Sequence, residues 1–541
     1  MSGHTPRRAL VLAGPMGAGK TTCGRLVAGW LGWPFEDLDE LIERATGKSV
    51  PELFERGEEA FRKAERAAVR AWLEQGGEGP RVLALGGGTL EDPELREVLA
   101  RAAAIVHLDA PGGVLASRLD RKARARRPLL AGVADAAARL DELRRARAAG
   151  YSVAAARVDT GNLDAAGAAV AVLRALYDPD AGPWAESPRP VLPEAPEVTF
   201  GRGGLPFSFD GGAAVLVDAG LPAVHAEAVL PRLRARTRGP LHEIRMPGGE
   251  ESKSPGALAR CWSELLAARA ERGTAFVVVG GGTLTDLGGL AAHTFKRGLP
   301  LFLLPTTLLG QVDAALGGKN GINLAGVKNV VGTVRLPRAV HIDPLFVLTL
   351  AEEDYRGGLA EALKSSLIGD RELFDLIEAR RQALAERRLF AVEEVAVRAA
   401  AVKLRVVARD LDERDERRRL NFGHTLGHAL ESAAARAGVR LSHGDAVAAG
   451  MVAALRLSRE LGFLAAPDLE RRVQDLLAAL GLPVAPPPEL LERMGEIAGA
   501  LAQDKKRSAG RQVWVLLRDA GDALCAEVGA GDVRRLLESV R

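Results

Sequence analysis

The chain has 541 residues, of which 47% are hydrophobic and 26% are charged, a composition that is typical of folded globular proteins and excludes a disordered or membrane-spanning chain. Its 73 basic and 70 acidic residues leave a net charge of +3, so we expect neither a nucleic acid nor a membrane as partner. The three scattered cysteines predict a reducing, cytoplasmic compartment without a disulfide framework, and the length predicts about three or four domains.

The predicted elements divide the chain into four parts. Residues 1–177 alternate apolar runs with helical stretches, which predicts a parallel α/β domain. Residues 178–196 contain six prolines, so we expect a semi-rigid linker. Residues 197–344 repeat the α/β pattern, and residues 345–541 are predicted to be mainly helical. The predicted strands include Ala9–Ala13, Val82–Leu85, Ile105–Leu108, Val215–Asp218, Phe276–Val279 and Leu301–Leu304, and the predicted helical stretches include Leu373–Leu384 and Val392–Val407.

A glycine-rich segment follows the first predicted strand. From Gly14 to Thr21 it has the spacing GxxxxGKT between a strand and a helix, which favours a loop whose backbone N–H groups bind phosphate oxygens. Lys20 would reach the outer phosphates and Thr21 would bind magnesium. The residues expected to contact ATP in this loop are Gly14, Gly17, Ala18, Gly19, Lys20, Thr21 and Thr22.

Further motifs follow this loop in a fixed order. They are Phe35–Glu43, Gly47–Val50, Gly57–Glu65, Gly86–Thr89, Arg126–Leu130, and Arg147 shortly before Tyr151. With this series, residues 8–177 resemble shikimate kinase, a P-loop NTPase of the nucleoside-monophosphate-kinase type. The resemblance implies ATP-dependent phosphorylation of shikimate.

The resemblance also implies residue roles. Asp39 would orient the attacking hydroxyl and accept its proton, and Asp37 would lie near the magnesium. Arg62 and Arg147 would bind the substrate carboxylate, for which guanidinium groups are well shaped. Arg127 would belong to a lid over the ATP and stabilise the transferred phosphoryl group. The residues expected to contact shikimate are Asp39, Arg62, Gly86, Gly87, Gly88 and Arg147. The alternative is a nucleotide-sensing binding module, which predicts loss of these acceptor residues, whereas all are present.

A second glycine turn lies in the third part of the chain. Val277–Val279 is a predicted strand that runs into Gly280-Gly281-Gly282, with Asp286 one turn later. Such a turn suits a pyrophosphate group. By itself it is a weak signal, because a purely structural turn is about as common.

Three of the nine histidines of the chain fall within a short window. His424 and His428 are four residues apart and would share one face of a helix, and His443 follows. Two imidazoles and a carboxylate make a catalytic zinc-type site with an open coordination position, and the best carboxylate candidate is Glu361. One histidine would remain to contact the substrate.

These segments, together with Leu304–Asp313, Gly317–Asn323 and Gly326–Asn329, resemble 3-dehydroquinate synthase over residues 197–541. The resemblance implies a Rossmann-like NAD-binding domain and a mainly α-helical metal-binding domain. It also implies NAD and zinc or cobalt as cofactors. The reaction would convert 3-deoxy-D-arabino-heptulosonate 7-phosphate into 3-dehydroquinate and phosphate, with NAD returned unchanged.

This second resemblance assigns most of the site. The metal ligands would be Glu361, His424 and His443. The catalytic residues would be Lys319, Lys364, Glu413 and His428. The NAD site would contain Asp218, Glu250, Lys253, Gly280, Gly281, Gly282, Asp286, Thr306, Thr307, Asp313, Lys319 and Lys328. The phosphate and carboxylate of the substrate would contact Arg297, Lys319, Lys328, Asn329, Lys403, Arg417, Asn421, His428, Lys505 and Lys506. Arg297 would serve the site of a neighbouring subunit, which implies a homodimer formed by this half.

Two alternatives remain for residues 197–541. One is another sugar-phosphate cyclase. The other is an iron-dependent alcohol or glycerol dehydrogenase, which has no phosphate to bind; the cluster of Arg297, Lys319, Lys328 and His428 argues against it. Because both halves would serve the synthesis of aromatic amino-acid precursors, the sequence favours one bifunctional enzyme. Asp445 stands where the synthase family usually has glutamate.

Overall fold

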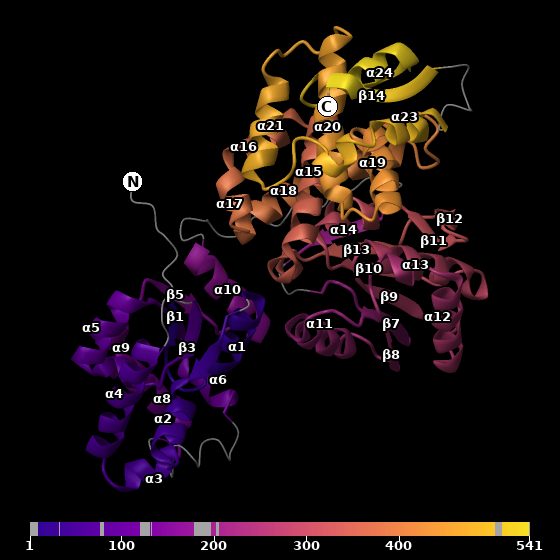
Figure 1. The fold of residues 1–541 in the computed structure, drawn as a ribbon. Helices are drawn as coiled ribbons and strands as arrows, with labels where there is room; N and C mark the ends of the chain where they lie inside the picture. Colours follow the sequence, from indigo (N-terminus) through magenta and orange to yellow (C-terminus); the bar gives the residue numbers. More distant parts are fainter. Residues whose placement is uncertain are drawn as a thin grey trace. The chain divides into compact units, whose positions relative to one another are not determined.

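The computed structural model describes residues 9–31, 33–75, 80–119, 130, 133–177, 196–201, 205–503 and 511–539. Residues 178–195 of the predicted linker, together with Arg127, Lys505 and Lys506, lie outside these ranges. The chain forms two compact units, residues 1–184 and 185–541 (Figure 1). No helix among the described residues is long and apolar enough to span a bilayer.

The first unit is built on a five-stranded parallel sheet of order β2-β3-β1-β4-β5. Its central strand has only buried residues, as expected for a parallel strand covered on both faces by helices. The strands are β1 (Ala9–Ala13), β2 (Phe35–Asp37), β3 (Arg81–Ala84), β4 (Ala104–Asp109) and β5 (Ala156–Asp159). The helices are α1 (Lys20–Leu31), α2 (Leu38–Thr46), α3 (Val50–Glu55), α4 (Glu58–Gln75), the 3-10 helix η1 (Thr89–Glu91), α5 (Pro93–Ala102), α6 (Gly112–Ser117), α8 (Ala136–Ala146), α9 (Ala148–Tyr151) and α10 (Ala165–Tyr177).

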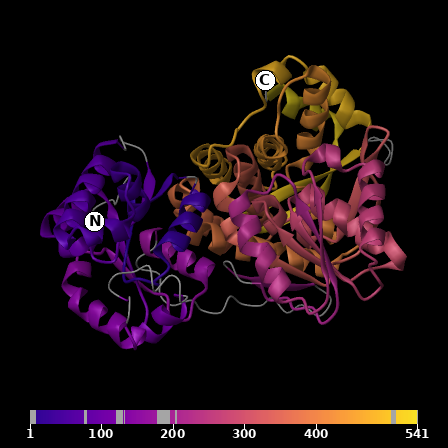
Figure 2. The same ribbon diagram turned by 90° about the horizontal axis from the view of Figure 1, so that it is seen from below.

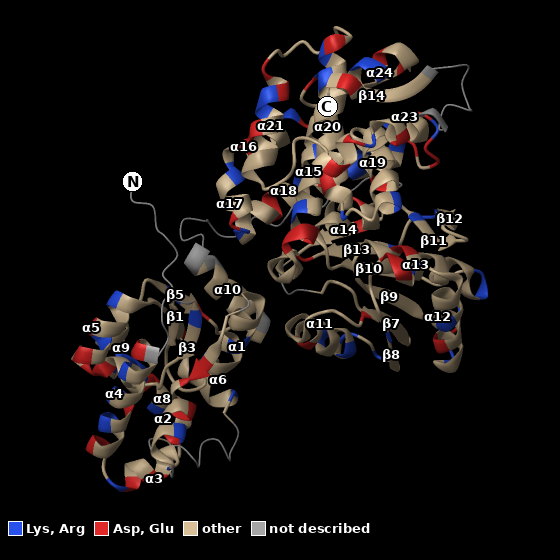
Figure 3. Cartoon of the chain, viewed as in Figure 1, with Lys and Arg blue, Asp and Glu red and all other residues tan. Residues whose placement is uncertain are grey.

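The second unit begins with a six-stranded parallel sheet of order β6-β13-β10-β9-β7-β8. The strands are β6 (Glu197–Phe200), β7 (Ala213–Asp218), β8 (Leu241–Met246), β9 (Ala275–Gly280), β10 (Leu301–Pro305) and β13 (Ala339–Ile342). Helices α11 (Ala223–Ala235), α12 (Pro255–Ala267), α13 (Gly282–Thr294) and α14 (Leu308–Val312) and the antiparallel hairpin β11 (Lys319–Leu324) and β12 (Val327–Val334) complete this part. Figure 2 shows the strands between flanking helices. Strands β9, β10 and β13 carry no charged residue, as expected for a covered sheet (Figure 3).

The rest of the second unit is mainly helical, as predicted. Its helices are α15 (Glu352–Gly369), α16 (Arg371–Ala379), α17 (Arg381–Ala385), α18 (Leu389–Arg409), α19 (His424–Ala437), α20 (His443–Glu460), α21 (Leu469–Ala479), α22 (Pro488–Leu491), α23 (Met494–Gln503) and α24 (Ala530–Ser539). The stretch expected to be one helix over Leu373–Leu384 is broken at Arg380 into α16 and α17. Fully buried side chains of α15, α18, α20 and α21 share one apolar core, where each large residue contributes about 1.5–3 kcal/mol.

An antiparallel hairpin, β14 (Arg511–Asp519) and β15 (Asp522–Gly529), also lies in this part, although the sequence pattern there predicted few strands. Trp514 and Leu516 of β14 pack with residues of α19 and α20. Short apolar runs of this kind cannot be distinguished from a buried helix by periodicity alone, which accounts for the difference.

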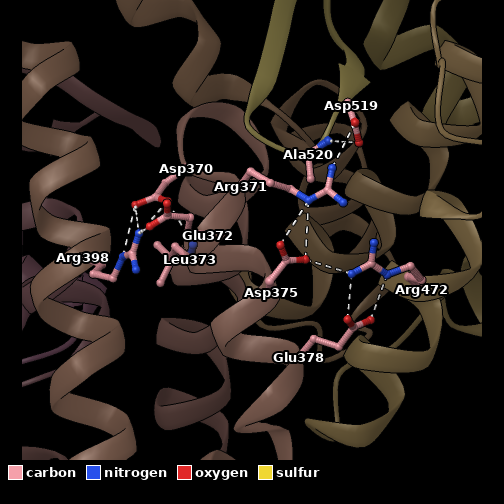
Figure 4. A network of polar contacts seen from close by, with 10 residues as sticks. All are labelled: Asp370, Arg371, Glu372, Leu373, Asp375, Glu378, Arg398, Arg472, Asp519 and Ala520. Atoms are coloured by element: carbon pink, nitrogen blue, oxygen red, sulfur yellow. Dashed lines mark hydrogen bonds and ion pairs between the residues drawn. The ribbon is translucent and has the colours of Figure 1, made fainter.

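Arginines from neighbouring helices converge on the acidic residues of and beside α16 (Figure 4). Arg398 of α18 pairs with Asp370 at 3.0 Å. Arg472 of α21 pairs with Asp375 at 3.0 Å and Glu378 at 2.7 Å. Because these pairs are partly exposed, each contributes only about 0–1 kcal/mol, but together they fix the positions of these helices.

Candidate active sites

The glycine-rich loop of the first unit connects β1 to α1. Gly14, Gly17 and Gly19 have φ values of 145°, 81° and 91°, a region that side chains other than glycine rarely adopt. Lys20 is the first residue of α1, and its ammonium group donates to the carbonyl oxygens of Gly14 at 2.8 Å and Pro15 at 3.0 Å. The loop therefore wraps a space at the helix N-terminus with a lysine above it, as a phosphate site requires.

Two aspartates lie beside this loop. Asp37 ends β2 and caps α2: its Oδ1 accepts the backbone N–H of Asp39 at 3.0 Å. Its Oδ2 accepts a hydrogen bond from Thr21 at 2.7 Å, so the two residues expected to bind magnesium are in contact. A Cβ built on Gly86 would lie 3.7 Å from Oδ1 of Asp39, which places this carboxylate beside the glycines that follow β3.

The arginines expected to bind a carboxylate meet above those glycines. Arg62 of α4 donates to the carbonyl oxygen of Gly88 at 3.3 Å. A Cβ on Gly88 would lie 2.9 Å from Nη2 of Arg62 and 3.2 Å from Nη2 of Arg147. Tyr151 donates to the carbonyl oxygen of Gly87 at 2.7 Å and so fixes this backbone. Both guanidinium groups therefore face the same space, although they are far apart in the sequence.

The sequence did not indicate two carboxylates at this site. Glu65 is buried, accepts from Thr89 at 2.6 Å and pairs with Arg62 at 2.8 Å. Glu91 pairs with Arg147 at 3.1 Å. The spacing of Arg62 and Glu65, three residues apart on a helix, is the one signal that could have identified the first pair.

In the second unit the turn Gly280–Gly282 joins β9 to α13, and no described side chain caps this helix. Lys253 lies beside it: its buried ammonium group donates to Asp286 at 2.7 Å and also contacts Asn329. Burial raises the pKa of Asp286 to about 6, although Lys253 opposes this change. The N-terminal N–H groups of α13 thus remain suited to a phosphate group, with a lysine near them.

Other residues predicted to contact NAD shape the backbone around this turn. Asp218 accepts N–H hydrogen bonds from two glycines at 2.9 and 3.1 Å. Glu250 accepts from Asn323 at 2.8 Å. Thr306 donates its backbone N–H to Gly280 at 3.0 Å, and Thr307 caps α14. Thr306 and Thr307 therefore lie beside the turn, whereas Asp218 and Glu250 fix neighbouring segments.

The three expected metal ligands come from three helices that pack through glycines. Helices α15 and α20 cross at Gly357 and Gly444, where a Cβ on Gly444 would lie 2.3 Å from Cα of Gly357. Glu361 lies one turn after this crossing on α15, and His443 is the first residue of α20. The close crossing thus brings the carboxylate beside the imidazole.

The third ligand is positioned by the packing of α19 on α20. His424 is the first residue of α19 and follows Gly423, whose φ is 79°. A Cβ on Gly423 would lie 2.8 Å from the carbonyl oxygen of Val447 on α20. His428 follows one turn later, and its ring centroid lies 5.2 Å from that of His424.

The resulting cluster has the chemistry of a metal site. Glu361, His424 and His443 each offer a ligand atom, and these atoms lie within 4.8 Å of one another. Glu361 lies 3.5 Å from Nε2 of His424 and 3.4 Å from Nε2 of His443. Both its oxygens are buried, and Lys364 is in ion-pair contact with one of them. One buried carboxylate and two imidazoles are the ligand types that bind a divalent metal ion of the zinc type.

Electrostatics differ between the two imidazoles. Burial lowers the pKa of His424 to about 3, so it is neutral and able to act as a ligand. Burial opposes a charge on His443, but Glu361 and Glu431 outweigh it and raise its pKa to about 10, so a metal ion that binds here has to displace a proton from this imidazole. Glu431, which the sequence did not single out, lies 3.5 Å from Nδ1 of His443. It leaves Nε2 directed at Glu361, an orientation that carboxylates commonly impose on metal-binding histidines.

A cavity of about 570 Å³ lies beside the glycine turn. Its lining residues are Asp286, Asp313, Ala314, Gly317, Lys319, Asn320, Gly321, Asn329, Val330, Gly332, Thr333, Val334, Lys403 and Arg417. Asp313 pairs with Lys403 at 2.8 Å and with Lys364 at 3.5 Å. Burial alone would raise the pKa of Asp313, but the two lysines lower it to about 2. Because Lys364 also contacts Glu361, the cavity and the metal-type cluster share one ion-pair network.

The cavity is lined by four of the ten predicted substrate residues: Lys319, Asn329, Lys403 and Arg417. Lys319 contacts Glu413, which also accepts from Asn421 at 3.2 Å. Arg417 is buried and donates to the carbonyl oxygen of Gly317 at 2.6 Å. Glu413 has a φ of 59°, and left-handed residues other than glycine cluster at functional sites.

Two predicted substrate residues stand apart from it. Arg297 lies on the exposed turn after α13, outside the lining of the cavity. The Lys328 side chain is 65% exposed and lies 3.9 Å from Glu431. Their roles stay predictions.

Family comparisons bear on both units. The model of the shikimate kinase family matches residues 16–176. The models described as 3-dehydroquinate synthase N-terminal and C-terminal match residues 243–357 and 358–507. Among solved structures, 2-epi-5-epi-valiolone synthase from Streptomyces hygroscopicus, with NAD⁺ and Zn²⁺ bound, is 30% identical, with a TM-score of 0.58, and the match covers 66% of this chain and 99% of that chain. A 2-deoxy-scyllo-inosose synthase complexed with carbaglucose-6-phosphate, NAD⁺ and Co²⁺ is 25% identical, with a TM-score of 0.54 and coverages of 64% and 96%.

Curated relatives connect the two halves. A 3-dehydroquinate synthase of Dehalococcoides mccartyi is 41% identical over 303 residues, which are 55% of this chain and 81% of that protein. The bifunctional shikimate kinase/3-dehydroquinate synthase of Thermotoga maritima is 35% identical over 452 residues, which are 82% of this chain and 83% of that protein. Both resemblances inferred from the sequence are thereby confirmed. The chain belongs to the family of bifunctional shikimate kinase/3-dehydroquinate synthases.

Proposed function

We propose that each unit performs its reaction at the residues described above: the first phosphorylates shikimate with ATP, and the second converts 3-deoxy-D-arabino-heptulosonate 7-phosphate into 3-dehydroquinate and phosphate. The observation that carries the proposal is that each unit brings groups for its whole reaction to one place. Opposed arginines lie beside a phosphate loop in the first. A metal-type cluster is connected to a basic cavity in the second.

In the kinase unit, the loop N–H groups and Lys20 hold the phosphates of ATP, and Thr21 and Asp37 hold the magnesium. Arg62 and Arg147 bind the carboxylate of shikimate. Asp39, beside Gly86, then accepts the proton of the hydroxyl that attacks the γ-phosphoryl group. Arg127 is proposed to neutralise the negative charge of the phosphoryl group in the transition state of its transfer.

In the synthase unit, Glu361, His424 and His443 would hold the metal ion, and the turn Gly280–Gly282 with Lys253 would hold NAD⁺. Bound zinc or cobalt supplies Lewis-acid polarisation of the substrate, and bound NAD⁺ takes up and returns a hydride. NAD⁺ and Zn²⁺ or Co²⁺ are the groups found in the related cyclase structures.

The protein side chains bind and orient this substrate. Lys319, Lys403 and Arg417 line the cavity and supply cations for its phosphate and carboxylate. His428, one turn after His424, is proposed to donate a hydrogen bond to the phosphate. Lys364 lies between Asp313 and Glu361 and keeps both carboxylates charged.

A metal-dependent alcohol dehydrogenase is not favoured for the second unit. Such an enzyme binds no phosphate, whereas three cationic side chains line this cavity. A sensing module is likewise not favoured for the first unit, because Arg62 and Arg147 are both aimed at the acceptor position.

The decisive experiment uses the pure full-length chain in two assays. One follows shikimate phosphorylation with ATP in excess magnesium. The other follows phosphate release from the heptulosonate phosphate with NAD⁺, before and after dialysis against a chelator. We expect both activities, loss of the second after dialysis and its return with Zn²⁺ or Co²⁺. Accumulation of free NADH without phosphate release would instead identify a dehydrogenase, and ATP binding without turnover would identify a sensing module.

We further propose a homodimer formed by the second unit. Arg297 is exposed and has a φ of 67°, and exposed valines follow one another along β12. These features fit a surface that contacts a second copy of the chain and contributes Arg297 to the active site of that copy. Sedimentation should give twice the chain mass. Mixing Arg297→Ala chains with chains inactivated at Glu361 should restore part of the phosphate release only if the arginine serves the neighbouring site.

A further inference from the structure

The carboxylate of Glu91 lies between the two arginines of the kinase unit. Glu91 ends η1, and its Oε2 lies 3.1 Å from Nε of Arg147 and 3.6 Å from Nη2 of Arg62. A Cβ built on Gly88 would lie 2.7 Å from the same oxygen. A carboxylate of the chain itself therefore shares the space above Gly88 with both guanidinium groups.

The two arginines depend on Glu91 to different degrees. Arg62 also pairs with the buried Glu65 at 2.8 Å. The side chain of Arg147 is only 8% exposed, and within the described ranges its sole carboxylate partner is Glu91. A buried guanidinium without an anion is unfavourable, so some carboxylate has to stay beside Arg147.

Glu91 can leave this position without movement of the backbone. Its N–H donates to the carbonyl oxygen of Gly88 at 3.0 Å, and α9 packs tightly on η1, because a Cβ on Gly150 would lie 2.8 Å from the carbonyl oxygen of Leu90. The Glu91 side chain, in contrast, is 42% exposed. Rotation about its side-chain bonds is enough to place the carboxylate in solvent.

We propose that Glu91 is a built-in competitor for the acceptor carboxylate: it occupies the position between Arg62 and Arg147 until shikimate displaces it, and it thereby lowers the affinity for shikimate. This inference rests on the role proposed above for the two arginines. Without shikimate, the Glu91 carboxylate stays paired with both guanidinium groups. When shikimate binds, its carboxylate takes the place of the Glu91 carboxylate.

Titration calorimetry on the full chain tests this with Glu91→Gln, which keeps the size and removes the charge. We expect the Kd and the KM for shikimate to fall by about two- to fivefold, which corresponds to one partly exposed ion pair. The KM for ATP and the kcat should stay within about twofold. Glu94→Gln is the matched control, because Glu94 pairs with the exposed Arg70 on the same segment and should leave all constants unchanged.

A thermal measurement guards against a folding defect. Without ligand, Glu91→Gln should lower the midpoint of thermal unfolding, since Arg147 loses its anion. Saturating shikimate should raise this midpoint by more in the variant than in the unaltered chain. An unchanged or raised Kd for shikimate overturns the inference and makes Glu91 a support for the arginines. If the unaltered chain itself fails to bind shikimate, the proposed kinase function is what fails.

Discussion

The two active sites use glycine in opposite ways. In the kinase unit, Gly14, Gly17 and Gly19 have positive φ values within one short loop. Residues that are neighbours in the sequence therefore form the phosphate loop. In the synthase unit, Gly357 and Gly444 lie in ordinary helices and matter because their backbones touch. The phosphate loop is encoded locally, whereas the metal-type cluster depends on the packing of helices that are distant in the sequence.

This difference changes how each site holds charge. The kinase loop is exposed at Gly19, and Lys20, which is half-buried, is hydrogen-bonded to loop carbonyls. In the synthase cluster Glu361 is buried and is surrounded by Lys364, His424 and His443. Loss of one charge should therefore be more damaging in the second site, where water cannot replace it.

The largest expected effect is that of Glu361→Gln. Phosphate release should fall by more than about 100-fold, since residues that only orient metal ligands already cost about 10- to 100-fold. Bound metal, measured by atomic emission, should fall with it. Kinase activity of the same preparation serves as the control and should stay within about twofold. A variant that keeps its metal and a tenth or so of its synthase activity would contradict the proposed ligand.

Lys20→Met gives the reciprocal test. Kinase kcat should fall by about 10²- to 10³-fold, because the transferred phosphoryl group loses a fixed cation. The synthase activity should not change, because Lys20 and the loop carbonyls to which it donates belong to the kinase unit. Loss of both activities in this variant would mean that the two units are not independent.

Helix packing in the synthase unit is tested by Gly444→Ala. The added methyl group would lie 2.3 Å from Cα of Gly357, so α15 and α20 must separate, at a cost of about 1–3 kcal/mol. The unfolding midpoint should fall by several degrees and the metal affinity with it. The control is Gly495→Ala on α23, where the new Cβ meets nothing within 4 Å and should be neutral or stabilising. Equal effects of the two substitutions would show that the crossing is not special.

The same contrast accounts for what could be predicted from the sequence. The phosphate loop, Asp37 and Asp39 follow one another along the chain, and Asp37 contacts both Thr21 and the backbone of Asp39. Their catalytic roles were implied by the resemblance and stay predictions. The scarcity of histidines pointed to the window of His424, His428 and His443, but the choice of His443 as a ligand came from the resemblance and stays a prediction, although Glu361, His424 and His443 do lie together. The six predicted strands coincide with β1, β3, β4, β7, β9 and β10, because short, mainly apolar runs are typical of buried strands; the other five strands of the two parallel sheets were not predicted.

Other features arise only from packing. Glu91 and Glu431 act through partners on other segments, and no local pattern distinguishes them from exposed acids. The Gly357–Gly444 crossing could not be predicted either, because neither glycine differs from any other helix glycine in its local sequence. The hairpin β14–β15 was missed because its apolar run fits a helix equally well.

A smaller effect concerns acid stability. Burial lowers the pKa of His225 and His293, both in the synthase unit, to about 4 from an ordinary value near 6.5. The unfolded chain binds these protons more readily, so the stability is complete above pH 6.5 and is lost as the pH falls toward 4. Each histidine contributes a slope of about 1.4 kcal/mol per pH unit in this window.

The variant His225→Gln isolates one of these slopes. Its amide can replace the 2.7 Å hydrogen bond to Thr349 but cannot take up a proton. Urea titrations from pH 4 to 7 measure the free energy of unfolding of the synthase unit, whose transition is the one that added NAD⁺ shifts. As the pH is lowered, this free energy should fall less steeply in the variant than in the unaltered chain, by about 1.4 kcal/mol per pH unit. Asp286, whose pKa burial raises to about 6, changes stability in the opposite direction in both proteins and therefore cancels from the difference. Parallel pH profiles of the two proteins would mean that His225 is not held neutral in the folded synthase unit.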